Sequence, residues 1–338
     1  MDTPVLEDVQ YRDWEKETSG TVRFALVGLG WWTTEHVIPA IESCARCTTT
    51  TVVSGSEAKR QQALETHDGV ETALGYDAFE RGEATGAYDA VYVCTPNAVH
   101  LDSVTAAVEH GKDVLVEKPM EATVERARDL VDVAESRPDV TLMVAYRMHT
   151  EPTARYARDL VQSGAVGEPK LVQGNMSQIL LDVIEDPDQW RLDPDLSGYG
   201  TSVMDIGIYP LNTARFVLDA DPVGVQSMMR SESAPFTAVP DEVATFEIAF
   251  DDGTLGAFTT SQNAHQSSRL EVIGDEGRIV LEPAFHGESS LGVTVGDTTV
   301  DVALPPVDQM EEEFEYFATK VLAGEPVYAD GAHGLVDL

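Results

Sequence analysis

Apolar and polar positions alternate in blocks along residues 22–146, and these blocks predict strands and helices in turn. Val22–Val27 is a run of apolar and β-branched residues, typical of a buried strand, and residues 31–41 have the apolar spacing of a helix. The further expected strands are 49–54, 70–73, 88–94, 114–116 and 140–146, and the further expected helices are 57–64, 77–79, 99–110 and 124–137. Strict alternation of this kind predicts a doubly wound parallel sheet of Rossmann type.

The pattern changes beyond residue 146. Helices are expected at 152–164 and 202–218, and the strands that follow are no longer separated by helices. The expected strands are 171–177, 243–250, 254–261, 270–273 and 278–281. Ala244, Phe246, Ile248 and Phe250 occupy alternate positions and should share one buried face. This part of the chain therefore predicts an α+β domain with an open, mainly antiparallel sheet and helices on one face.

The pattern thus divides the chain into three parts. Residues 1–20 have no periodicity and are expected to form an N-terminal arm. Residues 21–148 form the expected Rossmann domain, and residues 149–338 the expected domain for substrate binding and oligomerisation.

Two glycines directly follow the first strand. Gly28 would allow a sharp turn, and Gly30 would let backbone N–H groups approach a pyrophosphate at the start of the next helix. A strand, a glycine turn and a helix in this order favour dinucleotide binding. Thr33 stands where this fingerprint has a small third residue, so looser packing between helix and strand is expected there. Trp31 and Trp32 follow the turn and are also expected at the cofactor.

The end of the second strand bears on the choice of cofactor. NAD-binding domains place an acidic residue here for the ribose 2′-hydroxyl, whereas this chain has Ser54 and Ser56, with Lys59 and Arg60 in the next helix. Hydroxyls and cations suit a 2′-phosphate, which a carboxylate would repel. We expect NADP, with NAD as the weaker possibility because Glu57 lies one register shift away.

The charge balance is strongly acidic: 59 Asp and Glu against 22 Lys and Arg give a net charge of −37. Because the acids are dispersed over both halves, we interpret them as an adaptation to a salt-rich cytoplasm, where like charges are screened. A nucleic-acid partner is not expected, since it needs a basic footprint. No apolar run is long enough for a membrane span and no secretory signal is visible, so a cytoplasmic location is expected.

Cys44 and Cys47 have the CxxC spacing of redox pairs and of half a zinc site. A zinc site needs two further ligands, and neither a second CxxC nor a spaced His pair follows. No metal is expected.

A set of later motifs, taken together, resembles the glucose–fructose oxidoreductase/inositol dehydrogenase (GFO/IDH/MocA) family from residue 22 to the C-terminus. The motifs are Thr95-Pro-Asn97 with His100, Glu117-Lys-Pro119, Tyr146-Arg147, Gln189-Trp-Arg191, and Asp205-Ile-Gly-Ile-Tyr209 with Asn212. The family combines a Rossmann domain with an open-sheet domain, in agreement with the pattern above. Members usually continue into a terminal helix where this chain ends, so a truncated C-terminus is one expectation.

The resemblance implies an acid/base role for Tyr209 and a cis peptide bond between Lys118 and Pro119. A phenol is a weak base at neutral pH unless a cation stabilises the phenolate, and Lys118 follows a strand at the sheet's carboxyl edge. Asp205 lies four residues before Tyr209 and would accept hydrogen bonds from sugar hydroxyls. The other expected substrate contacts are Arg147, Trp190, Arg191 and Asn212, and the other expected cofactor contacts are Thr95, Pro96, Asn97, His100 and Glu117.

The implied reaction is NADP-dependent oxidation of an aldose at C1 by direct hydride transfer. The paired tryptophans, Tyr209 and the acidic composition favour family members of salt-loving archaea that convert D-xylose to D-xylonolactone. Two alternatives remain. One is a related enzyme that oxidises glucose or a trans-dihydrodiol, or that exchanges hydrides between sugars. The other is a non-catalytic regulatory protein that senses NADP. A homo-oligomer, dimer or tetramer, is expected through the second domain's sheet.

Overall fold

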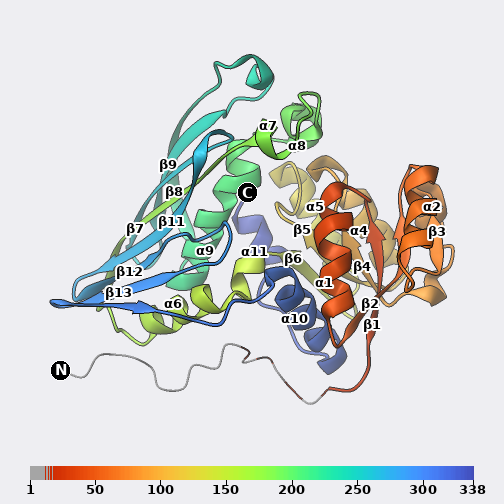
Figure 1. Ribbon diagram of the computed structural model, residues 1–338, viewed down its shortest axis with the longest axis horizontal. Coiled ribbons are helices and arrows are strands. Elements are labelled where there is room, and N and C mark those ends of the chain that lie inside the picture. Colours follow the sequence, from red (N-terminus) through yellow and green to blue (C-terminus); the bar gives the residue numbers. More distant parts are fainter. Residues whose placement is uncertain (1–11, 13, 15, 17) are drawn as a thin grey trace. The chain divides into compact units, whose positions relative to one another are not determined.

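The computed structural model describes residues 12, 14, 16 and 18–338, so most of the expected N-terminal arm lies outside the described residues. The described chain forms two compact units (Figure 1). The parallel-sheet unit contains residues 14–147 and 308–336 with Leu338, and the open-sheet unit contains residues 148–307 with Asp337. The sequence pattern predicts a single domain over residues 149–338, whereas residues 308–336 group with the parallel-sheet unit.

The parallel-sheet unit has six strands in the order β3-β2-β1-β4-β5-β6, and every neighbouring pair is parallel. The strands are β1 (Val22–Val27), β2 (Cys47–Val53), β3 (Thr72–Leu74), β4 (Ala90–Val93), β5 (Asp113–Glu117) and β6 (Leu142–Ala145). The helices are η1 (Thr33–Val37), α1 (Ile38–Ser43), α2 (Glu57–Thr66), α3 (Tyr76–Glu80), η2 (Thr85–Ala87), η3 (Asn97–Val99), α4 (His100–Glu109), α5 (Val124–Glu135), α10 (Gln309–Ala323) and α11 (Gly331–Val336). The strand order reverses beside β1, the place where a doubly wound sheet binds its ligand. The predicted Rossmann topology is confirmed.

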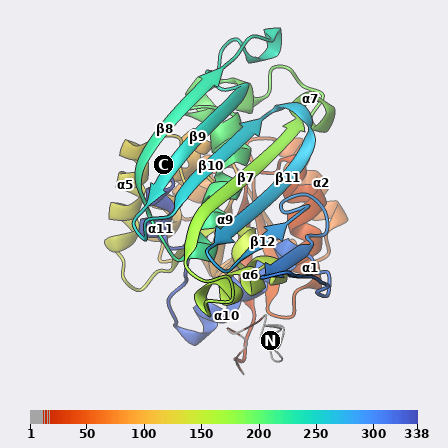
Figure 2. The ribbon, with the colours of Figure 1, turned by 90° about the vertical axis from the view of Figure 1, so that its left-hand side faces the viewer.

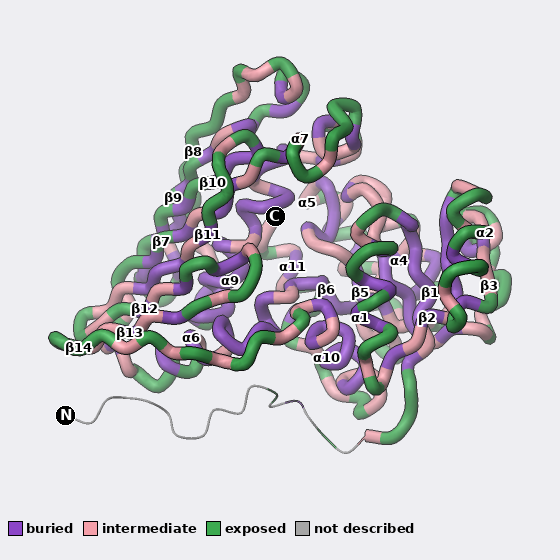
Figure 3. The backbone as a smooth tube through the Cα atoms, viewed as in Figure 1, coloured by how far each residue is buried: buried purple, intermediate pink, exposed green. Residues whose placement is uncertain are grey.

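Helix α10 completes the core of this unit although it comes from the far end of the chain. Phe314 packs edge-on against Phe24 of β1 at 5.2 Å between ring centroids, and Tyr92 of β4 lies equally close to it. Phe317 joins the same buried cluster. The buried tube segments of β1, β4 and α10 in Figure 3 follow from this packing. Residues of α10 thus fill a place beside the sheet that residues 14–147 leave uncovered.

The open-sheet unit has eight strands in the order β14-β13-β12-β11-β7-β10-β9-β8. Its strands are β7 (Pro169–Ile179), β8 (Pro222–Arg230), β9 (Val243–Phe250), β10 (Leu255–Ser261), β11 (Asn263–Gly274), β12 (Gly277–Leu281), β13 (Leu291–Val295) and β14 (Thr298–Val302). Its helices are α6 (Pro152–Gln162), α7 (Leu180–Val183), η5 (Trp190–Leu192), α8 (Pro194–Ser197), η6 (Ser202–Gly207), α9 (Ile208–Leu218) and η7 (Ala234–Phe236), and η4 (Arg147–His149) leads into the unit. All neighbouring strands are antiparallel except β7 and β10, so the mainly antiparallel sheet is confirmed.

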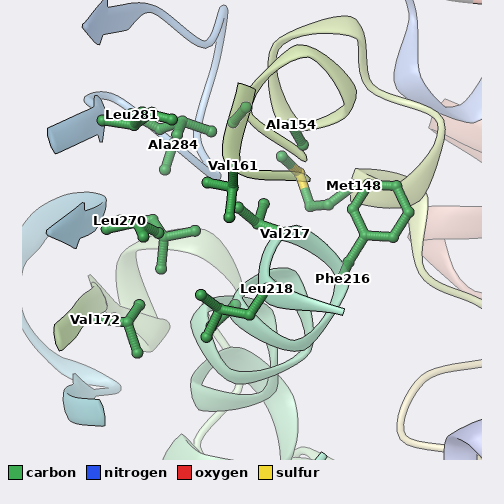
Figure 4. Packing of buried hydrophobic residues seen from close by; sticks show 14 of the residues in the cluster. Met148, Ala154, Val161, Val172, Phe216, Val217, Leu218, Leu270, Leu281 and Ala284 are labelled. Atoms are coloured by element: carbon green, nitrogen blue, oxygen red, sulfur yellow. The ribbon is translucent and has the colours of Figure 1, made fainter. Parts of the chain in front are cut away.

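Helices α6 and α9 cover one face of this sheet. Phe216 and Leu218 of α9 and Val161 of α6 pack into one buried cluster with strand residues such as Val172 and Leu270 (Figure 4). The alternate residues of β9 that were expected to share a face are all buried. The other face of the sheet is turned to the viewer in Figure 2, where β8, β9, β10, β7 and β11 lie side by side without a covering helix. The predicted arrangement of helices on one face is therefore confirmed.

Candidate active site

The glycine turn after β1 has the geometry expected of a phosphate loop. Gly28 has φ = +97°, and a Cβ at this position would lie 2.2 Å from the carbonyl oxygen of Cys94, so only glycine fits. A Cβ on Gly30 would meet nothing within 4 Å, which leaves the backbone of this turn open to an approaching group. Trp31 is exposed beside it and contacts Trp32, whose ring lies tilted against that of His36 with 4.6 Å between the ring centroids.

Thr33 explains how this turn accommodates a side chain at the third fingerprint position. Residues 33–37 form η1, a π-helical segment, and not the regular α-helix predicted for 31–41. Thr33 is fully buried, and its hydroxyl donates a hydrogen bond of 2.7 Å to the carbonyl of Gly28. The wider π turn gives room for the side chain. Where looser packing between helix and strand is expected, the Thr33 hydroxyl therefore makes a specific hydrogen bond to Gly28.

Two cations reach the ends of β1 and β2 from helix α2. Lys59 Nζ donates to the carbonyl of Leu29 at 2.8 Å, and the Arg60 guanidinium donates to the carbonyl of Ser54. Ser56 caps the helix by accepting from the backbone N–H of Lys59, while Ser54 accepts from the N–H of Ser56. The four residues named from the sequence are thus brought together. Glu57 is exposed in the first turn of α2, four residues after β2 ends.

The loops after β4 and β5 are tied together by His100. The His100 side chain is completely buried, and its two ring nitrogens lie 2.9 Å from the carbonyl of Thr95 and 3.3 Å from that of Met120. Burial lowers the pKa of His100, which favours the neutral imidazole. The ring therefore packs between the two loops, and its one N–H donates to the carbonyl of either Thr95 or Met120. Asn97 is also buried, whereas Thr95 and Pro96 are half-buried.

Glu117 ends β5 directly before Lys118. Its Oε1 accepts a hydrogen bond of 2.6 Å from the Tyr92 hydroxyl, and its Oε2 accepts one of 3.1 Å from the backbone N–H of Lys118. The peptide bond between Lys118 and Pro119 is cis, as the resemblance implies. Both Glu117 and Lys118 are half-buried at the carboxyl edge of the sheet.

Helix α10 adds two polar side chains that the motifs do not include. Gln309 accepts a hydrogen bond from the guanidinium of Arg147, which follows β6. Glu313 is buried with no hydrogen-bond partner on either carboxyl oxygen among the described residues. Burial, reinforced by the negative charge of Glu117, raises the pKa of Glu313 well above its usual value. Neither residue could be found from spacing, because α10 begins at residue 309, whereas the last strand of the sheet that it covers ends at residue 145.

In the open-sheet unit, Asp205 is the centre of a hydrogen-bonded group. Its Oδ2 accepts from Arg191 Nε at 2.9 Å and from Gln262 Nε2 at 2.8 Å. The Arg191 guanidinium lies over the ring of Trp190, 4.5 Å from its centroid. Behind this group, Gln178 donates to Oε1 of Gln262 at 2.9 Å. The structure brings together Asp205, Trp190 and Arg191 as predicted, and adds two glutamines that no motif marks.

The segment that carries Asp205 and Tyr209 is held by a second buried carboxylate. Asp205 lies in the π-helical segment η6, and Tyr209 is the second residue of α9. Asp241 accepts from the backbone N–H groups of Thr201 and Val203 at 2.7 and 2.8 Å. A Cβ on Gly200 would lie 2.4 Å from this carboxylate, so glycine is required there. Tyr209 is half-buried, with its ring 6.0 Å from that of Phe285.

Asn212 has a different environment from the one expected of a substrate contact. Its side chain is buried, and its amide donates to Asp337 at 2.8 Å. Arg215 pairs with the same carboxylate at 2.6 Å. The structure therefore gives Asn212 a place in a buried ion-pair network, which a motif alone could not reveal.

Cys44 and Cys47 both face α10. Their sulfurs lie 3.6 and 3.4 Å from the carbonyls of Glu311 and Phe314 respectively. The hydrogen bond that the Cys47 thiol makes with Cys44, together with burial, raises the pKa of Cys47, which makes it a poor ligand or nucleophile. Within the described part of the chain, no group of three His, Cys, Asp or Glu could hold a metal ion. No described helix is both long and apolar enough to cross a lipid bilayer.

These groups define what the two units can do chemically. The parallel-sheet unit offers an open glycine turn with two cations beside it, which fits a nucleotide bearing a phosphate. The open-sheet unit offers a carboxylate held by a guanidinium and an amide, which suits recognition of hydroxyl groups, and a half-buried phenol one turn further on.

Comparison with known proteins agrees with this chemistry. Residues 22–146 match the family described as "Oxidoreductase family, NAD-binding Rossmann fold", and residues 154–280 match the GFO/IDH/MocA C-terminal domain. The chain is 50% identical over 331 residues to D-xylose 1-dehydrogenase [NADP(+)] of Haloarcula marismortui, covering 97% of this chain and 91% of that protein. It is 30% identical to D-xylose 1-dehydrogenase (NADP(+)) 2 of Haloferax volcanii, covering 91% of each. Among solved structures, aldose-aldose oxidoreductase from Caulobacter crescentus complexed with glycerol superimposes with a TM-score of 0.86 at 28% identity, covering 94% of each chain.

Proposed function

Since this chain belongs to the GFO/IDH/MocA family of oxidoreductases, we propose that it oxidises D-xylose at C1 to D-xylonolactone with NADP+. The observation that carries the proposal is the 50% identity, over nearly the whole chain, to a protein named for this reaction. The open glycine turn and the hydroxyl-binding group around Asp205 support it independently.

In the proposed reaction, Tyr209 takes the proton of the C1 hydroxyl while the bond from hydrogen to C1 breaks. NADP+, when bound, would supply the acceptor for the hydride. Lys118 stabilises the phenolate of Tyr209, so that the phenol can act as a base near neutral pH. Asp205 accepts hydrogen bonds from sugar hydroxyls, and Arg191 keeps its carboxylate paired and oriented.

NADP is the cofactor, and Lys59 and Arg60 are the residues that we propose for its 2′-phosphate. Both side chains already reach the backbone at the ends of β1 and β2, so their charges lie beside the glycine turn. The end of β2 carries Ser54 and not an acidic residue, so no carboxylate opposes a phosphate there.

The test is reduction of NADP+ and NAD+ in molar salt with xylose, glucose, arabinose, ribose and a trans-dihydrodiol. Turnover with NADP+ and xylose well above the other pairs is the expected result. A strong preference for another substrate would retain the reaction type and refute the xylose assignment. NADP binding without turnover on any of them would indicate the regulatory alternative.

The base is tested separately. The Tyr209→Phe variant should lose about 10²- to 10⁴-fold in kcat, since general acid–base catalysis contributes this much. NADP binding, followed by quenching of tryptophan fluorescence, should stay at the wild-type Kd. Near-normal turnover of this variant would remove Tyr209 from its proposed role.

We also propose that two copies of the chain associate through the open sheet. On the face that α6 and α9 leave uncovered, strand β8 exposes Met228, and the neighbouring strands expose Leu255 and Leu171. A second copy can cover this apolar surface about a two-fold axis. Light scattering in molar salt should give a dimer or a multiple of it, and Met228→Asp with Leu255→Asp should shift it to monomer. Val183→Asp, at an exposed apolar residue outside the sheet, should leave the mass unchanged.

A further inference from the structure

The side-chain amide of Gln262 has little freedom to change its orientation. Gln262 is the single residue between β10 and β11 and is completely buried. Its backbone N–H donates to the Ser202 hydroxyl at 3.0 Å, and its carbonyl accepts from the N–H of Leu180 at 2.8 Å. The side chain therefore starts from a backbone fixed on both sides.

The orientation of the amide follows from its neighbour. Gln178 on β7 donates to Oε1 of Gln262, and this leaves the NH₂ end of Gln262 to donate to Asp205 Oδ2 at 2.8 Å. A reversed amide would place oxygen against oxygen at Asp205 and NH₂ against NH₂ at Gln178. The pair of glutamines thus forms a directed chain of donors that ends on the carboxylate.

Asp205 receives two donors on the same oxygen, one charged and one neutral. Arg191 approaches from η5, and Gln262 approaches from the turn between β10 and β11. Both bonds stabilise the ionised carboxylate and fix its rotation. Arg191 is the charged group that contacts Asp205 from another element, and Tyr209 follows on the helix that continues the segment of Asp205.

We propose that Gln262, oriented by Gln178, is a positioning residue that holds Asp205 as an ionised hydrogen-bond acceptor for the sugar. The proposal rests on the proposed function, in which Asp205 binds substrate hydroxyls. Gln262 acts through Asp205 and has no contact with the reacting atoms in this scheme. Its neutral amide supplies a donor without adding charge, which a lysine or glutamate at this place could not do.

The decisive variant is Gln262→Glu, which keeps the shape of the side chain but replaces the donor by a second carboxylate. We expect kcat/KM for the sugar to fall about 10- to 100-fold at neutral pH, the effect of losing a hydrogen bond to a charged group. The acid limb of log(kcat/KM) against pH should also move up by about one unit or more, because a like charge favours protonation of Asp205. The Kd for NADP should stay unchanged.

Further variants separate positioning from simple support of the fold. Gln262→Met removes the donor without a charge and should lower kcat/KM with a smaller shift of the acid limb. Gln178→Glu should reproduce part of the Gln262→Glu shift from one residue further away. Gln62→Glu makes the same change at an exposed position of α2 and should leave both rate and pH profile unchanged.

Two outcomes distinguish an error in the role of Gln262 from an error in the proposed role of Asp205. If Asp205→Asn keeps wild-type kcat/KM, the proposed role of Asp205 is wrong. If Asp205→Asn is impaired while Gln262→Glu and Gln262→Met keep the wild-type rate and acid limb, only the role of Gln262 is wrong. A loss of thermal stability in both Gln262 variants with an unshifted acid limb would assign Gln262 to the fold alone.

Discussion

At the scale of single residues, each unit places its chemical groups by hydrogen bonds from neighbouring side chains and backbone. Glu117 is held by the Tyr92 hydroxyl and by the backbone of the next residue, so Lys118 begins from a fixed point at the end of β5. Asp205 is fixed comparably by Arg191 and Gln262. The residues proposed to act in the reaction are therefore held in position by neighbouring residues that take no part in it.

The charge of Lys118 gives a prediction at this scale. In Lys118→Ala, the cation that stabilises the phenolate is gone, so the pH at which kcat rises should move upward, by about one unit or more. Lys118→Arg should shift the profile less, because the charge remains. Initial rates from pH 6 to 11 in molar salt would measure both. An unchanged profile in Lys118→Ala would show that this lysine has no electrostatic role in the step.

At the scale of elements, the π-helical turn η1 shows how a departure from a motif can be stabilised. Thr33 donates to the carbonyl of Gly28 inside the protein, where an unpaired carbonyl would be costly. Thr34, the next residue, is exposed and donates to the preceding turn. Thr33 and Thr34 therefore allow the same substitution to be compared at a buried and at an exposed site.

Thr33→Ala should lower the free energy of unfolding by about 1–3 kcal/mol, the cost of a buried acceptor left without its donor. Thr34→Ala should change it by less than about 0.5 kcal/mol, as expected for a surface site. Denaturant unfolding at one fixed molar salt concentration compares them. Equal losses in the two variants would contradict the importance of the bond to Gly28.

Helix α10 allows a prediction about pH. Burial raises the pKa of Glu313 in the folded state, so the native protein holds this proton to higher pH than the unfolded chain. Stability should therefore fall as pH rises above the ordinary glutamate range toward the raised pKa. Glu313→Gln removes this loss, and its free energy of unfolding should exceed that of the wild type increasingly as pH rises. Exposed Glu109→Gln should follow the wild-type curve.

The elements also show what the sequence could and could not predict. The strands of the parallel sheet have apolar runs bounded by turns, and those local signals were sufficient. Helix α10 was missed because Glu312, Glu313 and Glu315 are buried among its apolar residues and obscure the periodic stripe. Strand β8 has no buried face to create an alternating pattern, since nearly all of its residues are exposed. Similarly, Gln262 belongs to a one-residue connection, and no spacing rule singles out its amide.

At the scale of the whole molecule, we expect the net charge to affect the free energy of unfolding more than any single contact does. A net charge of −37 repels itself strongly when the Debye length is about 10 Å, as at 0.1 M salt, and much less when it is about 3 Å, as at 1 M. We expect the free energy of unfolding and the activity both to fall as salt is lowered between these limits.

A variant in which exposed acids are replaced by amides tests this cause directly. With Asp68→Asn, Glu71→Gln and Glu80→Gln, repulsion is reduced while the core is unchanged, so less stability should be lost at 0.1 M salt. Denaturant unfolding of both proteins at 0.1 M and 1 M salt is the measurement. Identical salt dependence of the two proteins, or full stability of the wild type at 0.1 M, would show that self-repulsion does not limit this fold.

The return of residues 308–336 to the first unit has a consequence for how the chain folds during synthesis. The ribosome releases β1 to β6 early, but Phe314 and Phe317, which pack against Phe24, emerge only after the whole open-sheet unit. At elongation rates of about 5–20 residues per second, that interval is on the order of ten seconds or more. During this time, the nascent parallel sheet has one apolar side without its helix, so the unit that is translated first can be completed only last.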